Sequence, residues 1–513
     1  MGSHLHVVWF KRDLRVLDHA PLSSAAQSGT VLPLYIFEPT VWRSPDMSSR
    51  HRWWVTESVR ELRADLAKLG QPLVVREGEA VDVLRDIHRA FGAFTLWSHE
   101  ETGNAQTFER DKAVGAWCRA EGILWHEPRQ FGVVRRLRSP ERWTEQWEAV
   151  MTAPSIHPPQ ALFPLLIDIG DIPPTPNDFE PSSLHQRPGE RAAHHCLNSF
   201  LTERGESYSR SISSPLTARN FGSRLSPYLA WGNLSMRTVV TATRKTIALL
   251  RERPPLARGT WLRSLSAFES RLHWHCHFIQ KLESEPSIEF NTFIPALNTM
   301  RDGHHSESYL TAWQEGRTGY PFVDACMRSL RATGWLNFRM RAMLVSFAAY
   351  DLFLDWRTFS HFLAREFLDY EPGIHYPQIQ MQSGTTGINA LRMYDPVKQG
   401  YDHDPRGDFI RAWVPELGAI KGPLIQEPWK LSPLELTEAG VRLGQDYPER
   451  VVIHLEAVRR AREVIREWRN RPEFRSESKT TLSRHGSRKR RHRGTARPAR
   501  TPSQLSLFPT GEA

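Results

Sequence analysis

The chain has 513 residues, a formal net charge of +10 and four cysteines. The cysteines are scattered without CxxC spacing, which argues against a disulfide framework and favours a reducing compartment. No apolar run approaches the roughly 20 residues that a membrane span needs, and no secretory signal is visible, so we expect a cytoplasmic protein that contacts no membrane.

Residues 1–130 alternate between short apolar runs and helical segments. Helical periodicity occurs near 52–69, 80–90 and 105–120, between or after four runs of strand length: Val7–Phe10, Val31–Phe37, Leu73–Arg76 and Phe94–Trp97. This alternation predicts an α/β domain with a doubly wound parallel sheet. No GxGxxG follows any of these runs, so a dinucleotide site of the usual kind is not expected here.

The central part of the chain divides into a linker and a helical region. Residues 131–196 are rich in proline and predict a long extended linker. Residues 197–469 have a helical pattern that predicts an all-α domain, with one apolar stripe formed by Leu265, Phe268, Leu272, Ile279 and Leu282. Residues 340–354 are apolar nearly all round, which is typical of a buried helix.

The final segment, residues 470–513, carries most of the net charge. It contains eleven Lys or Arg against three Glu, a net charge of +8, which leaves +2 for the rest of the chain. It lacks apolar periodicity, so we expect it to be disordered. A charge run such as Arg488–Arg493 is usually solvated, but it can also add salt-sensitive contacts to nucleic-acid phosphates.

Four sequence blocks combine aromatic, arginine and acidic residues within apolar helical sequence: Trp313–Pro321, Gly334–Arg341, Asp355–Arg357 and Arg411–Leu417. Burial of a guanidinium is costly unless an anion compensates it, so Arg339 and Arg341 predict a bound anionic ligand. In their order and spacing the four blocks resemble the flavin-binding half of the photolyase/cryptochrome family. The resemblance extends over roughly residues 5 to 470.

The resemblance implies an antenna-type α/β domain, an all-helical FAD-binding domain and FAD as cofactor. Tyr208 and the loop Gly222-Ser223-Arg224-Leu225-Ser226 match the pyrophosphate-binding segment, in which backbone N–H groups ahead of a helix bind phosphate oxygens. Residues beside the isoalloxazine ring are matched by Arg341, Asp369 and Glu371. The alternatives are an ordinary helix cap for the loop and a structural ion pair for the charged residues.

The pocket for damaged DNA is matched in part. Trp274 matches the tryptophan that stacks on a flipped pyrimidine dimer, and Arg271 stands where the family has a glutamate that hydrogen-bonds the dimer. We expect these two residues and Arg339 to contact DNA. The second usual tryptophan matches Ile379 or a neighbour and is lost, which leaves the lesion specificity open.

The expected catalytic residues are Trp274, His375 and Trp356. His375 stands where many photolyases have an asparagine facing flavin N5. Trp356 matches the middle member of the family's electron-transfer chain, whereas the outer member matches Gly303 and the member nearest the flavin has no clear counterpart. Photoreduction therefore requires another aromatic route, for which the candidates are Trp335, Tyr350, Tyr370 and Tyr376.

A histidine cluster in the predicted helix over 265–282 raises the question of a metal. His273 and His277 are four residues apart and share a helix face, the spacing of a zinc pair. The sequence places no third ligand, and the alternatives are a role in flavin or lesion contact and a surface or structural role. We therefore expect no metal site, and the scattered cysteines argue against an iron–sulfur cluster.

The resemblance implies light-driven repair of UV-damaged DNA in the nucleoid, with cyclobutane dimers favoured over (6-4) products. A cryptochrome that signals without repair is the alternative, favoured by His375, Arg271 and the missing tryptophans. A light-independent DNA-binding scaffold is a third interpretation, which the flavin motifs disfavour.

A second chromophore and one protein partner are also predicted. Lys11–Arg15 and Glu100–Gly103 match antenna sites of the family but do not distinguish a folate, a deazaflavin or a flavin. The peptide Gln504–Phe508 resembles the motif that binds the bacterial DNA polymerase sliding clamp, so we expect the clamp to be a partner. We expect the protein to be a monomer.

Overall fold

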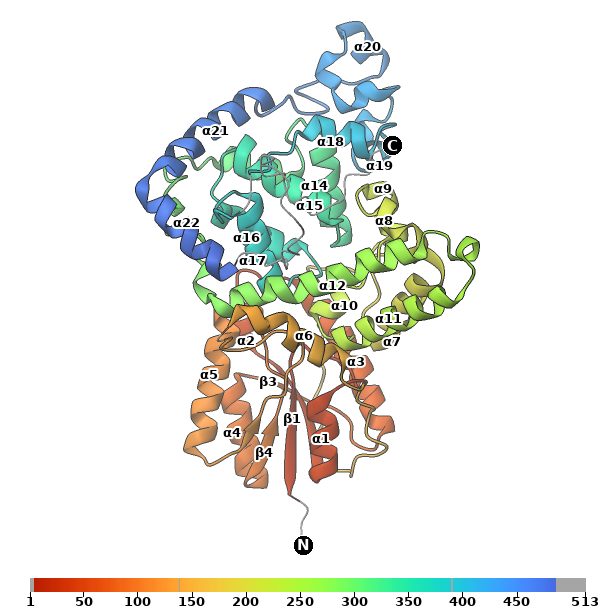
Figure 1. Ribbon diagram of the computed structural model, residues 1–513, viewed down its shortest axis with the longest axis vertical. Helices are drawn as coiled ribbons and strands as arrows, with labels where there is room; N and C mark the ends of the chain where they lie inside the picture. The colour runs from red at the N-terminus through yellow and green to blue at the C-terminus, as the bar shows by residue number, and fades with distance from the viewer. Residues whose placement is uncertain (1–3, 138, 389–390, 486–513) are drawn as a thin grey trace, which may run out of the picture.

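The computed structural model describes residues 4–137, 139–388 and 391–485. The basic cluster Arg488–Arg493 and the clamp-like peptide Gln504–Phe508 lie outside the described residues. An α/β domain at one end of the molecule is joined to a larger helical domain (Figure 1). No helix in the described part of the chain is long and apolar enough to cross a bilayer.

The N-terminal domain is built on a five-stranded parallel sheet with the strand order β3-β2-β1-β4-β5. The strands are β1 (Leu5–Phe10), β2 (Thr30–Phe37), β3 (Val74–Glu77), β4 (Phe94–Trp97) and β5 (Trp125–His126). The helices around them are α1 (Ala20–Ser28), α2 (Pro39–Trp42), α3 (Ser49–Lys68), α4 (Ala80–Phe91) and α5 (Ala105–Ala120).

Both faces of this sheet are covered. Val8 and Phe10 of β1 share a core with α1 and α3, whereas Val7 and Trp9 share one with α4 and α5. Because helices lie on both sides, β1 is buried along its whole length. The predicted doubly wound α/β domain is therefore confirmed.

The linker predicted over 131–196 is not extended throughout. It contains α6 (Trp143–Thr152) and the first residues of α7 (Glu190–Ser199), so the prediction is wrong for these segments. Trp143, Trp147 and Met151 recur every four residues and are buried on one face of α6, a pattern that the prolines downstream obscured. The residues between α6 and α7 pack along the α/β domain, and the Val75 N–H of β3 donates to Ile169 O in this segment (2.8 Å).

The helical domain is arranged around α12 (Trp261–Ser284), which packs against α11 (Met236–Glu252) and α17 (Pro372–Gln382). The predicted apolar stripe of α12 is buried from Leu265 to Leu282. The remaining helices up to residue 450 are α8 (Tyr208–Ser211), α9 (Pro215–Phe221), α10 (Ser226–Ala230), α13 (Glu307–Glu315), α14 (Pro321–Thr333), α15 (Phe338–Ser346), α16 (Trp356–Glu366), α18 (Pro396–His403), α19 (Asp408–Trp413) and α20 (Pro433–Glu438).

Residues 340–354 are buried as predicted, but they do not form a single helix. α15 ends at Ser346, a π-helical turn over Phe347–Asp351 follows, and Phe353 has a φ of 53°. The wider turn and the left-handed residue end the helical path before Leu354.

The described part of the chain ends with α21 (His454–Asn470) and α22 (Pro472–His485). The prediction of disorder from residue 470 is wrong for residues 472–485. Phe474 of α22 is buried, Thr481 Oγ1 donates to Phe293 O (3.2 Å), and His485 Nε2 lies 2.6 Å from a Glu285 carboxylate oxygen. This helix is stabilised by contacts with distant segments, which apolar periodicity does not reveal.

The two domains meet at the loop that follows β1. Arg12 stacks on the Trp231 ring at 4.6 Å, and its guanidinium donates to Ala230 O (2.9 Å) and Tyr370 O (2.5 Å). Gly232 has a φ of 69°, and a Cβ there would lie 2.1 Å from Arg12 O, so this close approach requires glycine. The joint holds the β1 loop beside residues 370–372 of the helical domain.

Candidate functional site

The predicted ring-binding residues meet in a pocket between α15, α16 and α17, here called the α15–α17 pocket. Arg341, Asp369, Glu371 and His375 all line it. The other lining residues are Phe338, Ala342, Val345, Leu363, Phe367, Tyr370, Ile374, Gln378, Ile379 and Gln382. The short connection between α16 and α17 supplies the acidic residues, so their placement depends on the packing of these two helices.

Arg341 and Asp369 form a bidentate ion pair at the pocket wall. Arg341 Nη1 donates to Asp369 Oδ1 (2.9 Å) and Nη2 to Oδ2 (2.8 Å), while the guanidinium lies 4.1 Å from the Phe367 ring centroid. The anion that compensates Arg341 is therefore within the protein, and the inference that its burial requires an anionic ligand is wrong. Arg339 does not line the pocket; its charge acts on His403, whose pKa is lowered to about 4, mainly by burial.

Glu371 and His375 present two different hydrogen-bonding groups to the pocket. Glu371 caps α17 by accepting from the Gly373 N–H (3.3 Å), and burial raises the pKa of its carboxyl group against the nearby charge of Arg12. His375 Nε2 lies 2.9 Å from Ser360 O. Since a carbonyl oxygen only accepts, Nε2 carries the proton and Nδ1 is left as an acceptor. Burial lowers the pKa of His375 to about 4, so the ring is neutral at pH 7.

The loop 222–226 connects α9 to α10 and is stabilised by Arg204, which donates to the carbonyl oxygens of Gly222 and Ser223. Arg224 adopts a φ of 59° and places its guanidinium 3.9 Å from the Trp335 ring centroid. Among the described residues no carboxylate lies within ion-pair distance of Arg224. Burial, together with the charge of Arg219, lowers its pKa to about 9, and Cys196, Asp369 and Tyr228 oppose this shift. Leu225 is buried and Ser226 begins α10.

Tyr208 is buried at the start of α8. Its ring contacts Phe200 and Phe268 edge-on, at centroid distances of 5.5 and 5.7 Å. Burial raises its pKa to about 12, and the charge of Arg271 acts in the opposite direction, so these two residues lie near each other. Tyr208 of the predicted pyrophosphate segment and the predicted DNA-contacting Arg271 are therefore neighbours.

Trp274 and Trp356 lie outside the lining of the α15–α17 pocket. Trp274 is partly exposed on α12, with its ring 5.1 Å from His277 and 5.7 Å from Phe278. Trp356 is fully buried, and Tyr376 lies 6.4 Å from it. Tyr376 is in turn 5.3 Å from His375, so an aromatic series leads from the pocket to Trp356.

Two histidines of α12 lie against the same tryptophan of α6. His273 and His277 both contact Trp143 of α6, at 4.8 and 5.6 Å. A three-residue cluster of possible metal ligands occurs elsewhere, at Asp13, His19 and His99. The Asp13 carboxylate accepts from His19 Nε2 (2.9 Å) and His99 Nδ1 (2.7 Å). Sequence reasoning missed this cluster because its members are brought together only by the adjacent carboxyl ends of β1 and β4.

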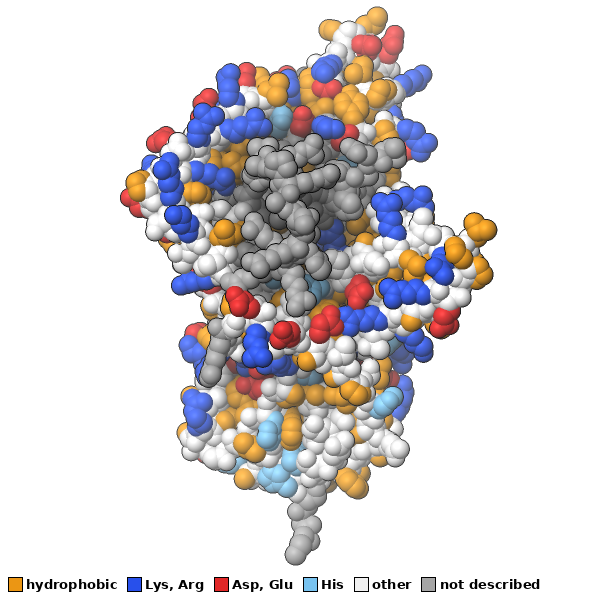
Figure 2. Space-filling model, in the orientation of Figure 1, with side chains coloured by type: hydrophobic (Ala, Val, Ile, Leu, Met, Phe, Trp, Pro, Cys, Tyr) orange, Lys and Arg blue, Asp and Glu red, His pale blue; other side chains and the backbone are white. Residues whose placement is uncertain are grey.

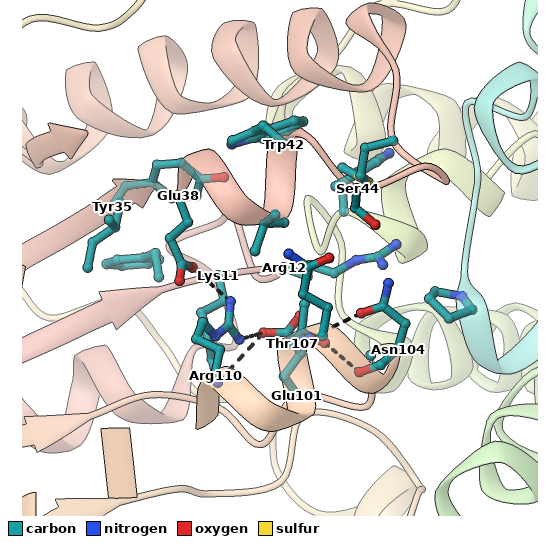
Figure 3. A pocket seen from close by; sticks show the side chains of 18 of the residues that line it. Lys11, Arg12, Tyr35, Glu38, Trp42, Ser44, Glu101, Asn104, Thr107 and Arg110 are labelled. Atoms are coloured by element: carbon teal, nitrogen blue, oxygen red, sulfur yellow. Dashed lines mark hydrogen bonds and ion pairs between the residues drawn. The ribbon is translucent and has the colours of Figure 1, made fainter. Parts of the chain in front are cut away.

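A second pocket lies at the carboxyl ends of β1 and β2, here called the β1–β2 pocket (Figure 3). Lys11, Arg12, Glu101 and Gly103, from the two predicted antenna segments, line it, whereas Asp13, Leu14 and Arg15 do not. The other lining residues include Trp9, Tyr35, Glu38, Trp42, Ser44, Asn104, Thr107, Arg110, Tyr370 and Pro372.

Charged side chains in the β1–β2 pocket neutralise each other. Arg110 donates to Glu38 (2.9 Å) and Glu101 (2.5 Å), and dashed lines around Arg110 in Figure 3 mark such pairs. Lys11 Nζ donates to Asp111 (3.1 Å), which lies outside the lining. Arg110 also lies 4.8 Å from the Trp9 ring centroid. Burial raises the pKa of Glu38 to about 7 despite this partner. The pocket therefore offers an aromatic surface surrounded by paired charges.

One residue, Tyr370, lines both pockets. Its hydroxyl donates to Asp46 Oδ2 (2.5 Å), and Asp46 also accepts from Asn104 Nδ2 (2.9 Å), a residue of the β1–β2 pocket. Sequence reasoning named Tyr370 only as a candidate for electron transfer. Its place between the pockets results from the docking of the two domains.

Two family models match the chain: DNA photolyase over residues 6–135 and the FAD binding domain of DNA photolyase over residues 268–467. A deoxyribodipyrimidine photo-lyase of Agrobacterium fabrum is 30% identical over 89% of this chain and 96% of its own. Cryptochrome-1 of Arabidopsis thaliana is also 30% identical, over 90% of this chain and 70% of its own. A class III photolyase structure from Agrobacterium tumefaciens has a TM-score of 0.78 and 26% identity, over 92% and 99% of the two chains. Since the similarity spans both domains, the chain belongs to the photolyase/cryptochrome family.

Proposed function

We propose that this protein is a deoxyribodipyrimidine photo-lyase that uses FAD and blue light to split UV-induced pyrimidine dimers in DNA, with cyclobutane dimers as the favoured substrate. The observation that carries the proposal is the α15–α17 pocket, in which Arg341, Asp369, Glu371 and His375 meet. The match to an FAD-binding domain supports the identity of the cofactor, and the similarity to photolyases supports repair.

The donor set of the site suits FAD. Arg224, with the loop 222–226, would hold the diphosphate, since a partly buried guanidinium that has no carboxylate partner among the described residues is stabilised by an anion. Glu371 offers a carboxyl group to a ring N–H, and His375 Nδ1 offers an acceptor. Bound FAD supplies the light-driven electron transfer to the dimer. The residues of the chain bind the ring, orient it and exclude water from it.

Trp274 and Arg271 are the proposed contacts to the lesion. The partly exposed indole of Trp274 provides a stacking surface for a base that has left the duplex. Arg271, on the same helix and near Tyr208, provides a cation for the nucleotide, and Arg339 a further phosphate contact. Lys and Arg side chains are frequent on the outer face of α21 and α22 (Figure 2), which favours binding of a polyanion on this side.

The β1–β2 pocket is the proposed site of a second chromophore. Its position at the carboxyl ends of parallel strands is where open α/β sheets commonly bind ligands. The partly exposed Trp42 offers an aromatic ring, and Glu38 with a raised pKa offers a hydrogen-bonding group. These features suit a planar heteroaromatic molecule of the folate, deazaflavin or flavin class.

A cryptochrome that senses light without repair is the second candidate. It is favoured by His375 at the N5 position and by Ile379, which lines the pocket near the place of the lost tryptophan. The 30% identity to a plant cryptochrome equals that to a photolyase.

Light-dependent repair by the purified, FAD-loaded and reduced protein separates the candidates. The substrates are matched oligonucleotides that carry one cyclobutane dimer, one (6-4) lesion or no damage, with dark samples as controls. We expect restoration of the cyclobutane dimer in light only. Repair of the (6-4) lesion alone would show that the proposed substrate is wrong. Absence of any repair by protein that holds photoreducible FAD would refute photolyase activity and support the cryptochrome.

A further inference from the structure

A series of polar side chains follows the face of α17 that lines the α15–α17 pocket. His375, Gln378 and Gln382 are spaced by three and four residues, so they share one helix face, and all three line the pocket. Gln382 is 3% exposed. Among the described residues, neither the amide oxygen nor the amide nitrogen of Gln378 or of Gln382 has a hydrogen-bond partner.

Such a pair of amides is unfavourable for the fold alone. An amide removed from water without a partner destabilises the folded state, and buried polar groups are rarely left in this condition. Gln380 on the same helix shows the contrast. Its amide accepts from the Phe293 N–H (2.8 Å) and donates to Ile288 O (2.7 Å) and Asn291 O (2.8 Å), away from the pocket. Gln380 thus connects α17 to residues 288–293, whereas the amide groups of Gln378 and Gln382 are available to hydrogen-bond a ligand in the pocket.

We propose that Gln378 and Gln382 form a carboxamide pair that hydrogen-bonds the isoalloxazine ring of FAD and increases its affinity for the protein. This inference rests on the proposed function, in which the pocket holds that ring. The ring carries carbonyl oxygens, bare nitrogens and an N–H, and each carboxamide carries both a donor and an acceptor, so the two are complementary. Phe338, Ala342 and Val345 of α15 contribute only apolar side-chain contacts.

A pyrimidine base has a similar edge of carbonyl and N–H groups, so the flipped lesion is the competing ligand of the same chemistry. The position of the pair favours the flavin. Both glutamines line the pocket that contains the Arg341–Asp369 pair and Glu371, whereas Trp274, the proposed stacking partner of the lesion, does not line it.

The test uses Gln378→Met, Gln382→Met and the double variant of the full chain, because methionine preserves the length and helix propensity of glutamine but removes its hydrogen bonds. Gln445→Met, at an exposed position, is the matched control. FAD is titrated in the dark into flavin-depleted protein and followed by quenching of flavin fluorescence. We expect Kd to rise about tenfold for each single variant and further for the double variant. The absorption bands of bound FAD should shift, and the control should match the wild type.

Two further readouts complete the test. The melting temperature of the flavin-depleted variants should equal or exceed that of the wild type, because each exchange removes an amide without a partner; a fall would indicate a structural role and contradict the proposal. Unchanged FAD affinity and spectrum in the double variant would also overturn it. Unchanged FAD affinity together with weaker dark binding of a dimer-containing oligonucleotide would overturn it as well, because the two glutamines would then bind the flipped base. Failure of the proposed function appears instead in the wild type, as absent FAD binding or absent repair.

Discussion

At the level of single residues, Arg341 and Arg224 differ in whether a carboxylate of the protein neutralises the charge of the guanidinium. Arg341 is held by two hydrogen bonds to Asp369, so it shapes the pocket without requiring a ligand. Arg224 stacks on Trp335 and has no carboxylate partner among the described residues, and burial lowers its pKa to about 9. A sequence cannot make this distinction because both arginines occur in similar aromatic surroundings.

Replacement of Arg224 by Met should therefore weaken FAD binding without unfolding the protein. Loss of charge-assisted hydrogen bonds to a phosphate costs about 1.5–3 kcal/mol, or roughly 10- to 100-fold in Kd. The measurement is a fluorescence titration with FAD, and Arg251→Met, at an exposed position on α11, is the control. Equal FAD affinity of the Arg224 variant and the control would show that Arg224 does not bind FAD.

His375 should contribute to the pH dependence of stability. Its pKa is about 4 in the folded protein, below the usual 6.5, so the unfolded chain binds more protons between these values. Its contribution is complete above pH 6.5 and is lost as the pH falls towards 4, by roughly 3 kcal/mol at most. His375→Asn, which does not titrate, should lose less stability than the wild type between pH 7 and 4.5 in urea unfolding. Parallel pH profiles for wild type and variant would contradict this, and His157→Asn, at an exposed site, serves as control.

At the level of elements, α17 and α22 show two ways in which a helix depends on its surroundings. α17 is capped by Glu371, and one face carries the pocket residues while Gln380 joins it to residues 288–293. α22 has little apolar periodicity, and its order depends on Phe474, Thr481 and His485, which contact the region around residues 285–294.

The contribution of α22 can be measured with two variants of the same helix. Phe474→Ala should destabilise the protein by about 2–4 kcal/mol, because it removes a buried ring from the core around Ile294. Leu482→Ala, at a site that is 54% exposed, should change stability by less than about 0.5 kcal/mol. The free energies of unfolding come from urea denaturation, and similar values for both variants would mean that α22 adds nothing to the core.

At the level of the whole molecule, the joint between the domains determines how the two pockets are related. Arg12 and Gly232 bring the β1 loop against residues 370–372, and Tyr370 consequently lines both pockets. In the proposed function, the separation between a second chromophore in the β1–β2 pocket and FAD in the α15–α17 pocket would therefore depend on this contact.

Gly232→Ala should disturb the joint, because the added Cβ would meet the backbone of Arg12 and Asp13. Gly422→Ala is a matched control with a similar positive φ and no atom within 4 Å of the added Cβ. We expect Gly232→Ala to be less stable than the control by about 2 kcal/mol or more. Limited proteolysis should also cut residues 153–189 faster in this variant. Equal stability and equal cleavage of the two variants would show that the joint does not constrain the domains.

The clamp-like peptide Gln504–Phe508 lies outside the described residues and stays a prediction. Deletion of residues 504–508 should abolish co-purification with the bacterial sliding clamp and leave FAD content unchanged, since the peptide is far in sequence from the proposed flavin-binding residues. Replacement of the same five residues by Gly and Ser is the control for length. Co-purification of the clamp with either variant would refute the prediction that this peptide binds the clamp.

Much of the fold and part of the site were predictable from local patterns. The strands near Val7, Val31, Leu73 and Phe94 and the buried stripe of α12 follow from apolar periodicity. The errors over 143–152 and 472–485 concern helices whose apolar residues are few or lie beside prolines, so that long-range contacts decide their structure.

The sequence by itself determined the family, the two-domain architecture and the identity of Arg341, Asp369, Glu371 and His375 as pocket residues, because motif order and periodicity are local properties of the chain. Only the tertiary structure decided that Asp369 neutralises Arg341, that Tyr370 lies between two pockets, and that Gln378 and Gln382 have no partners within the described fold. Burial, pKa shifts and hydrogen-bond satisfaction depend on residues that are distant in sequence and become neighbours only when helices and domains pack.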